Sequence, residues 1–367
     1  MKQSPVLERR AITVQGIVQG VGFRPFVHAL AHLNGLAGSV RNDAEGVHIE
    51  VEGPTAALDQ FLSGIRRDAP ALALVERVEW QPCRPRGERE FRIEQSSAGS
   101  RRGALISPDV ATCVDCLREL FDPADRRHRY PFINCTNCGP RFTITRAVPY
   151  DRASTTMVGF PMCPACQGEY DNPADRRFHA QPNACPVCGP RVGLVDRTGR
   201  DILTTGEDVI ARAVELLRGA AIVAIKGLGG YHLACDPFNP QAVRTLRARK
   251  ARQDKPFALM ARDLEQARGF CRVGSEEGAL LTAGARPIVL LDRRPDDGIA
   301  DAVAPRQTTL GVMLAYTPLH HLLLQAAAIP LVMTSGNRSD EPIAYRDEDA
   351  FSQLGEIGFY FIFHDRR

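Results

Sequence analysis

The sequence predicts a multidomain α+β protein with three parts, and the chain length and three sequence patterns lead to this prediction. The chain has 367 residues, enough for two to four domains at roughly 100–200 residues each. A βαββαβ pattern over residues 1–97 predicts a ferredoxin-like unit. Duplicated cysteine pairs over 98–196 predict two four-cysteine zinc-finger units. Helices alternating with apolar strands over 197–367 predict an α/β domain.

Composition and charge narrow the class of protein. The chain is 44% apolar and 24% charged, as is ordinary for a globular protein, and its net charge of +3 is too small for a uniformly basic nucleic-acid binder. No stretch approaches the ~18–20 apolar residues of a membrane span. The polar segment Met1–Arg10 lacks the apolar core of a secretory signal. We therefore expect a cytosolic protein, in which metal binding or catalysis explains cysteines better than disulfides do.

The N-terminal part alternates strand and helix patterns. The expected elements are strand 10–18, helix 25–33, a hairpin of strands 38–42 and 47–51, helix 54–67, and strands 75–80 and 91–94. Pro25 at the first helical position marks a helix start. The glycine-containing loop before it can present backbone N–H groups to an anion, and Arg24 adds a planar guanidinium suited to phosphate.

These residues resemble the acylphosphatase family. The similarity lies in Gly16-x-Val18-Gln19-Gly20-Val21-Gly22-Phe23-Arg24, together with Asn42 and Gly46. The resemblance implies that Arg24 and the loop Gln19, Gly20, Val21, Gly22 and Phe23 bind the phosphate of an acyl phosphate, and that Asn42 orients the attacking water. Such a site stabilises the phosphoryl group without a titrating nucleophile. The alternative is a degenerate domain that binds phosphate but does not catalyse hydrolysis.

Eight of the 11 cysteines form four C-x-x-C pairs with a regular spacing. The pairs are Cys113/Cys116, Cys135/Cys138, Cys163/Cys166 and Cys185/Cys188. Eighteen residues separate the pairs within each half, and the whole unit recurs at an offset of 50. The motif Pro123–Arg127 recurs as Pro173–Arg177, and Cys138–Arg141 recurs as Cys188–Arg191. A duplicated supersecondary unit explains this pattern.

Two C-x-x-C turns complete a tetrahedral set of four thiolates, which suits a structural Zn²⁺ with no open position for a substrate. The spacing therefore predicts two structural zinc sites, with an iron–sulfur cluster or a redox dithiol as weaker alternatives. It favours pairing within each repeat but leaves an interleaved pairing open. His128 and His179 do not align between the repeats and are not predicted ligands. The remaining Cys83, Cys235 and Cys271 are expected to be incidental thiols.

The C-terminal part contains a second anion-binding pattern. Strand 221–225 leads into a loop from Lys226 to Asp236, and a basic helix is expected over 240–252. Further strands are expected at 257–260, 288–291 and 331–334. The order G-x-x-x-x-G-K of a P-loop is missing. Three of the four lysines in the chain, Lys226, Lys250 and Lys255, fall in this part.

This part is similar to the YrdC-like family in its Lys250-x-Arg252 and Ser335-x-Asn337 pairs. The resemblance implies that these four residues line a pocket for ATP, with magnesium as its counter-ion, and for an acyl adenylate. The further nucleotide-binding candidates are Lys226, His232, Lys255, Arg286 and Thr334.

The three parts in this order resemble the HypF carbamoyltransferase family of [NiFe]-hydrogenase maturation. The resemblance implies hydrolysis of carbamoyl phosphate to carbamate and formation of carbamoyl adenylate from ATP. It also implies transfer of the carbamoyl group to the C-terminal cysteine of HypE, as precursor of the metal-bound cyanide ligands. The family continues into a further transferase domain, and the one His-x-x-x-His spacing in this sequence, His28 and His32, falls in the N-terminal part. We therefore expect a fragment or a truncated gene product, with the YrdC-like domain cut short at its end and no transfer to the partner.

Two other functions fit parts of the pattern. YrdC-like proteins also make threonylcarbamoyl adenylate for tRNA modification, although that route does not begin from an acyl phosphate. A zinc-ribbon RNA-binding protein could use Arg126, Arg127, Arg176, Arg177 and the basic helix, but few aromatic residues are available there to stack on bases.

Overall fold

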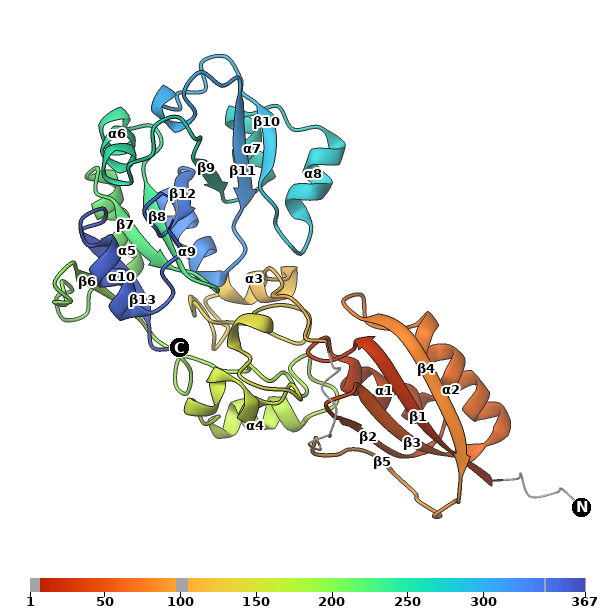
Figure 1. Cartoon of the computed structure of the whole chain (residues 1–367). Coiled ribbons are helices and arrows are strands. Elements are labelled where there is room, and N and C mark those ends of the chain that lie inside the picture. Colours follow the sequence, from red (N-terminus) through yellow and green to blue (C-terminus); the bar gives the residue numbers. More distant parts are fainter. Residues whose placement is uncertain (1–6, 97–104, 340, 367) are drawn as a thin grey trace, which may run out of the picture. The chain divides into compact units, whose positions relative to one another are not determined.

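The computed structural model describes residues 7–96, 105–339 and 341–366, which form two compact units (Figure 1). The first unit consists of residues up to Asp109 together with Asn134–Gly189. The second consists of Val110–Ile133 together with the residues from Pro190 onward. Within the described ranges, no helix is both long and apolar enough to cross a bilayer.

The first unit contains the predicted ferredoxin-like sheet. Its elements are β1 (Leu7–Ile17), α1 (Phe23–Leu33), β2 (Ala37–Asn42), β3 (Val47–Pro54), α2 (Thr55–Arg67), β4 (Leu74–Cys83) and β5 (Phe91–Ile93). The strand order is β4-β1-β3-β2-β5, with antiparallel pairing except between β2 and β5 (Figure 1). The strand β5, which the sequence predicts over 91–94, joins the sheet at the β2 edge.

The alternation of apolar residues in β1 explains why this sheet has one buried face. Ile12 and Val14 point into a core that also contains Val27 of α1 and Phe61 of α2. Fully burying a side chain of this size contributes about 1.5–3 kcal/mol. The spacing of the apolar residues in both helices matches the 3.6-residue period, so each helix presents one apolar stripe to the sheet.

A glycine fixes the turn between β2 and β3. Gly46 has φ +156°, and a Cβ atom there would lie 2.2 Å from the carbonyl oxygen of Val14. The amides of Glu45 and Gly46 both donate to Asp43 Oδ1, at 2.7 and 2.9 Å. The turn therefore holds Asn42, the last residue of β2, in a defined position.

The remainder of the first unit consists of short elements. They are the 3₁₀ helices η1 (Phe142–Ile144), η2 (Arg152–Ser154) and η3 (Thr156–Gly159), and the helix α4 (Pro164–Asp171). Pro164 stands at the first position of α4 and follows the N-cap residue Cys163.

The second unit is built on an eight-stranded mixed sheet with the order β10-β11-β9-β12-β8-β7-β13-β6 (Figure 1). The strands are β6 (Val192–Asp196), β7 (Val223–Lys226), β8 (Tyr231–Cys235), β9 (Ala258–Ala261), β10 (Val289–Asp292), β11 (Thr309–Leu314), β12 (Leu331–Ser335) and β13 (Tyr360–His364). The helices are α3 (Val114–Phe121), α5 (Val209–Arg218), α6 (Pro240–Arg249), α7 (Leu264–Phe270), α8 (Ser275–Thr282), η4 (Asp301–Val303), α9 (Pro318–Ala327) and α10 (Asp347–Leu354).

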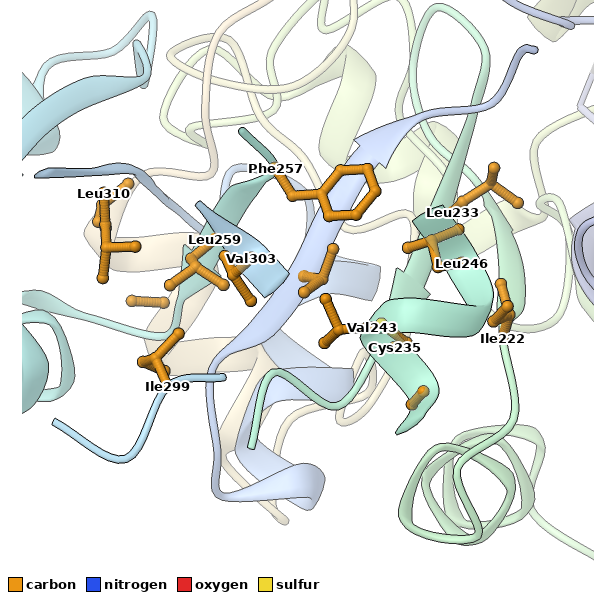
Figure 2. Close-up of a cluster of buried hydrophobic side chains, with 14 of the residues drawn as sticks. Ile222, Leu233, Cys235, Val243, Leu246, Phe257, Leu259, Ile299, Val303 and Leu310 are labelled. Atoms are coloured by element: carbon orange, nitrogen blue, oxygen red, sulfur yellow. The ribbon is translucent and has the colours of Figure 1, made fainter. Parts of the chain in front are cut away.

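The core of the second unit joins the central strands to α6. Figure 2 labels Leu233 and Leu259 from the sheet, Val243 and Leu246 from α6, and Phe257, which all belong to one cluster of buried side chains. All five side chains are buried. This packing fixes the position of the C-terminal end of α6, where the predicted nucleotide-binding residues begin.

Two expected elements differ from the structure. Residues 226–236 are not a single loop, because Tyr231–Cys235 forms β8 between β7 and β12. The basic helix predicted to reach residue 252 ends at Arg249, and Lys250 is its C-cap. Ala251 takes the left-handed conformation with φ +50°, and the Arg252 amide donates to the Arg247 carbonyl, as in a Schellman motif. An alanine occupies the place usually taken by glycine, so the sequence carried no stop signal.

Candidate functional site

The glycine loop places Arg24 at the start of α1. Gly22 is the N-cap of α1 and has φ +73°, so the chain turns sharply into a helix whose first amides have no partner within the helix. Arg24 follows in the first helical turn and is 8% exposed. A helix N-terminus with an adjacent guanidinium favours an anionic ligand.

Arg24 is held in place by residues far along the chain. Its Nη2 lies 2.8 Å from Asp151 Oδ1 and donates to the Tyr150 carbonyl at 3.4 Å. Its Nη1 donates to Ser96 Oγ at 3.3 Å. Because Asp151 is partly exposed, a phosphoryl group can compete with this carboxylate for the guanidinium.

Asn42 shares one pocket with Arg24. The pocket is lined by Gly20, Gly22, Arg24 and Asn42 from the N-terminal segment, and by Tyr150 and His179 from the segment 134–189. Asn42 is buried, and among the described residues its Oδ1 atom has no hydrogen-bond partner. The structure therefore brings together the two residues that sequence reasoning singled out for catalysis.

Within the predicted phosphate loop, the five residues have different positions. Gly20, Gly22 and Phe23 line the pocket, whereas Val21 is part of the apolar core. Gln19 is buried beside the pocket, and its amide group forms three internal hydrogen bonds. Its Nε2 donates to the carbonyls of Asp43 and Gly46 at 2.7 and 2.8 Å, and its Oε1 accepts from the Tyr150 amide at 2.9 Å. The Gln19 side chain thus holds the loop, the β2–β3 turn and Tyr150 together.

Arg141 connects the glycine loop to a cysteine pair. Its Nε donates to the Gly20 carbonyl, and its Nη1 donates to the carbonyls of Cys138 and Pro140 at 2.9 and 2.8 Å. Its Nη2 donates to the carbonyls of Cys135 and Thr136 at 3.0 and 2.9 Å. All five guanidinium donors are therefore used by backbone carbonyls. Arg141 organises the pocket wall and has no donor left for a ligand.

Burial keeps two other pocket side chains neutral. It lowers the pKa of His179 to about 4, with a smaller contribution from the positive charge of Arg24. It also raises the pKa of the Tyr150 phenol. Near pH 7 the pocket lining therefore has two cations, Arg24 and Arg141, of which Arg141 is fully hydrogen-bonded to backbone carbonyls, alongside an imidazole and a phenol that carry no charge.

The eight paired cysteines form two separate clusters with local pairing. One contains Cys113, Cys116, Cys135 and Cys138, and the other contains Cys163, Cys166, Cys185 and Cys188. In each cluster the four sulfur atoms lie within 4.8 Å of one another. The prediction of pairing within each repeat is confirmed, and both clusters consist of cysteine alone.

The sulfur geometry fits a tetrahedral metal site. The Sγ–Sγ distances are 3.9 Å for Cys135–Cys138 and 3.8 Å for Cys185–Cys188. A tetrahedral site with Zn–S bonds of about 2.3 Å places its sulfurs about 3.8 Å apart. A hydrogen bond from the Cys166 amide helps lower the pKa of the Cys163 thiol to about 7, which favours the thiolate that binds metal.

The two repeats contain equivalent hydrogen bonds from backbone amides. The amides of Arg127 and Arg177 each donate to an aspartate two residues earlier, at 2.7 Å in both copies. Arg129 and His179 occupy equivalent positions, both with left-handed φ, at +56° and +54°. Arg127 and Arg177 are buried, so they do not form the charged surface that an RNA-binding function would require.

The predicted nucleotide residues Lys250, Ser335 and Asn337 lie in direct contact. Lys250 Nζ donates to the carbonyls of Ser335 and Asn337 at 2.6 and 2.5 Å, and to Asn337 Oδ1 at 2.7 Å. Ser335 Oγ donates to Asn337 Oδ1 at 2.6 Å. Burial lowers the pKa of Lys250 to about 8, helped by the charges of Arg252 and Lys255. All three ammonium donors serve the Ser335–Asn337 turn, so Lys250 shapes this turn.

Lys226 and His232 have partners that the sequence did not indicate. Lys226 Nζ lies 2.6 Å from Asp347 Oδ1, which also accepts from the Tyr231 hydroxyl at 2.7 Å. His232 Nε2 lies 2.8 Å from the Tyr316 hydroxyl, and burial lowers the pKa of His232 to about 4.

The remaining nucleotide candidates are dispersed. Thr334 is buried on β12, and its neighbour Ser335 pairs with His232 in the sheet. Arg252 donates to the carbonyls of Lys255 and Pro256 at 2.9 and 2.6 Å, and Lys255 is exposed. Arg286 donates to the Leu281 carbonyl at 3.0 Å, and among the described residues no hydrogen bond or ion pair joins it to the Lys250 cluster.

Sequence reasoning missed Tyr150, Asp151 and His179 at the first pocket, which contains Arg24, and Asp347 beside Lys226. The residues at the first pocket lie more than 100 positions after the glycine loop, and no motif links them to it. The repeat offered one indirect signal, because residues 129 and 179 are equivalent and only one is a histidine.

These features define a multidomain α+β protein in which an acylphosphatase fold is joined to two four-cysteine clusters and a YrdC-like mixed sheet. Family models match accordingly: Acylphosphatase over residues 10–93, HypF finger over 112–145 and 162–195, and the Sua5/YciO/YrdC model, described as Telomere recombination, over 215–367. The Acylphosphatase of Moorella thermoacetica is 48% identical over 91 residues, covering 24% of this chain and 97% of that relative.

Two longer relatives cover nearly the whole chain. Carbamoyltransferase HypF2 of Cupriavidus necator is 51% identical over 383 residues, covering 99% of this chain and 47% of the relative. The crystal structure of full-length HypF in the phosphate- and nucleotide-bound form superposes with a TM-score of 0.94 at 45% identity, covering 100% of this chain and 48% of that one. The chain belongs to the HypF family and corresponds to its N-terminal half, spanning about half the length of the relatives it matches.

Proposed function

We propose that this chain catalyses two consecutive steps in the maturation of [NiFe]-hydrogenases. In the first, water hydrolyses carbamoyl phosphate to carbamate and phosphate at the Arg24 pocket. In the second, carbamate and ATP give carbamoyl adenylate and pyrophosphate near the Lys250–Asn337 turn. The observation that supports this proposal most directly is the shared pocket of Arg24 and Asn42 in a member of the HypF family.

The first step needs charge stabilisation and a positioned water. The Arg24 guanidinium and the amides at the start of α1 neutralise the phosphoryl oxygens as the transition state forms. The Oδ1 atom of Asn42, which has no hydrogen-bond partner among the described residues, accepts a hydrogen bond from the attacking water and directs it at phosphorus. The leaving carbamate is a carboxylate, so no strong acid is required.

The second step is an attack of a carbamate oxygen on the α-phosphorus of ATP, with pyrophosphate as the leaving group. Lys250 holds the Ser335–Asn337 turn in place, and Arg252 and Lys255 add positive charge close to it. These cations stabilise the triphosphate, whose remaining charge is balanced by magnesium bound to the nucleotide.

The two cysteine clusters fit structural zinc. Four thiolates per ion leave no open coordination position, so the metal holds the two knuckles together and takes no part in either reaction. A cytosolic location is part of the proposal, since that compartment keeps thiols reduced for metal binding.

The acceptor of the carbamoyl group in this proposal is the C-terminal cysteine of HypE, and the product is the precursor of the metal-bound cyanide ligands. We assign this transfer to the portion of the relatives that the present chain does not span. Incubation of the chain with HypE, carbamoyl phosphate and ATP is expected to leave the HypE mass unchanged. Carbamoylation of HypE by this chain alone would contradict that assignment.

The release of phosphate and pyrophosphate tests both steps at once. With carbamoyl phosphate and ATP, the wild-type chain should release both products. Arg24→Ala should abolish phosphate release, and Lys250→Ala should abolish pyrophosphate release when carbamate is supplied directly. Arg66→Ala and Arg268→Ala, at exposed positions on α2 and α7, are the matched controls and should match the wild type.

The same assay separates the alternative function. Pyrophosphate release with threonine, bicarbonate and ATP, and none with carbamoyl phosphate and ATP, would refute the proposal and favour a threonylcarbamoyl-adenylate synthase. Melting curves for each variant establish that a lost activity does not reflect unfolding.

A further inference from the structure

Three residues that line the Arg24 pocket each carry a buried polar atom without a hydrogen-bond partner among the described residues. Among the described residues, Asn42 Oδ1, Tyr150 Oη and His179 Nδ1 have no hydrogen bond, and all three residues line this pocket. Tyr150 is 2% exposed. A buried polar atom left unpaired costs about 1–3 kcal/mol. Three of them around one pocket indicate that a bound molecule supplies the missing partners.

Two of these side chains come from outside the acylphosphatase segment. The acylphosphatase model matches residues 10–93, whereas Tyr150 and His179 belong to the duplicated cysteine region. Without Tyr150 and His179, the pocket that contains Arg24 and Asn42 would lack part of its lining. The segment 134–189 therefore adds chemistry that the N-terminal domain lacks by itself.

Both side chains are held rigidly. The Tyr150 amide donates to Gln19 Oε1 at 2.9 Å and its carbonyl accepts from Arg24. A Cβ atom on Gly20 would lie 3.4 Å from the Tyr150 ring, so the ring packs against the glycine loop. The His179 amide donates to the Tyr170 carbonyl at 3.0 Å, and the His179 ring lies 4.9 Å from the ring of Tyr170. Such fixed groups recognise a ligand at low entropic cost.

The pocket offers a ligand two kinds of contact, one from charged groups and one from neutral polar groups. Arg24 and the loop amides suit the phosphoryl group. The phenol of Tyr150 and the imidazole of His179 carry no charge near pH 7, so together they offer hydrogen-bond donors and acceptors to a neutral polar group.

We propose that Tyr150 and His179 are specificity-determining residues that hydrogen-bond the acyl end of the substrate and select an acyl group with both N–H donors and a carbonyl acceptor. A carbamoyl group has this chemistry, whereas an acetyl group of the same shape replaces the NH₂ with a methyl group. This inference rests on the proposed function and deepens it. A site built to hydrogen-bond an NH group rejects the analogue without it, because its buried polar atoms are then left unpaired.

The test compares carbamoyl phosphate with acetyl phosphate in the full chain. Tyr150→Phe removes only the hydroxyl group, and we expect kcat/KM for carbamoyl phosphate to fall about tenfold, as for one lost hydrogen bond. The value for acetyl phosphate should change less than about threefold, and inhibition by inorganic phosphate should be unchanged. Tyr345→Phe, at an exposed tyrosine of the second unit, is the matched control.

His179 is tested by a pair of substitutions. His179→Ala should reduce the preference for carbamoyl phosphate over acetyl phosphate about tenfold. His179→Asn should retain most of it, because asparagine tolerates the left-handed backbone at φ +54° and its amide places a polar atom near the position of Nδ1.

Several outcomes would overturn the inference. Equal losses for both substrates, or weaker inhibition by phosphate, would show that these residues support the pocket or the phosphoryl group instead. Unchanged kinetics in Tyr150→Phe and His179→Ala would show that their polar atoms bind only water. The wild-type rate tests the proposed function separately. No phosphate release from carbamoyl phosphate would refute both, whereas wild-type hydrolysis with an unaltered preference in the variants refutes this inference alone.

Discussion

Replacing Gln19 with leucine is expected to destabilise the first unit by about 3 kcal/mol. The Gln19 amide group forms three hydrogen bonds, at 2.7, 2.8 and 2.9 Å, with the carbonyls of Asp43 and Gly46 and the amide of Tyr150. Gln19 is 1% exposed, so water cannot replace the lost partners without rearrangement. At about 1 kcal/mol for each hydrogen bond, the loss adds up to about 3 kcal/mol.

The single tryptophan provides the assay. Trp80 lies on β4, which pairs with β1, so its fluorescence reports unfolding of the sheet of the first unit. Urea unfolding followed at this residue should show a lower midpoint in Gln19→Leu with an unchanged slope. Gln60→Leu, at an exposed glutamine on α2, is the matched control and should shift stability by less than about 0.5 kcal/mol.

The same variant links structure to catalysis. Because Gln19 joins the β2–β3 turn to Tyr150, its loss should displace Asn42, and phosphate release from carbamoyl phosphate should fall even in the folded protein. Gln19→Leu with wild-type stability to within 1 kcal/mol would refute the reasoning, since it would show that the three buried bonds are readily replaced. Full activity in the folded variant would refute the link to Asn42.

Three further predictions concern the metal sites, the pH response and the β2–β3 turn. The purified chain should contain two zinc ions and lack visible iron–sulfur absorbance, and a strong chelator should lower the melting temperature, as measured by elemental analysis and calorimetry. Burial lowers the pKa of His321 to about 4, so its contribution to stability is complete above pH 6.5 and is lost as the pH falls from 6.5 to 4. Between pH 7 and pH 4.5, the fall in the free energy of unfolding, measured with urea, should be smaller in His321→Leu than in the wild type by up to about 3 kcal/mol. An equal fall in both proteins would contradict the assignment. Gly46→Ala should lower the free energy of unfolding, followed by Trp80 fluorescence, by about 3 kcal/mol or more, because its Cβ would lie 2.2 Å from the Val14 carbonyl oxygen. Gly87→Ala, with open space around it, should lower it by about 1 kcal/mol.

Local patterns predicted the elements that local interactions determine. The alternation in β1, the start of α1 after the glycine loop and the β2–β3 hairpin all follow from residues close in sequence, and the structure confirms them. The local pairing of the cysteines is confirmed in the same way, since each cluster closes within one repeat. The end of α6 differed because Ala251 adopts a conformation that only a glycine would have indicated.

The pocket walls were not predictable, because they depend on contacts across the chain. Asp151 pairs with Arg24 over more than 120 positions, and Asp347 pairs with Lys226 over a similar separation. No spacing rule relates such residues. Lys250 and the Ser335–Asn337 turn are also far apart in the sequence, but the family resemblance indicated both of them. The structure places them in hydrogen-bond contact. Their assignment to nucleotide binding stays a prediction.

The equivalent positions 129 and 179 have a consequence for how a duplicated module diverges. Both copies require the same unusual backbone angle and the same amide-to-carbonyl bond, but neither requirement involves the side chain. One copy carries an arginine that pairs with Asp208, and the other carries a histidine that lines the Arg24 pocket. In the inference proposed above, duplication leaves one copy free to take up a new chemical task while the architecture of both stays intact.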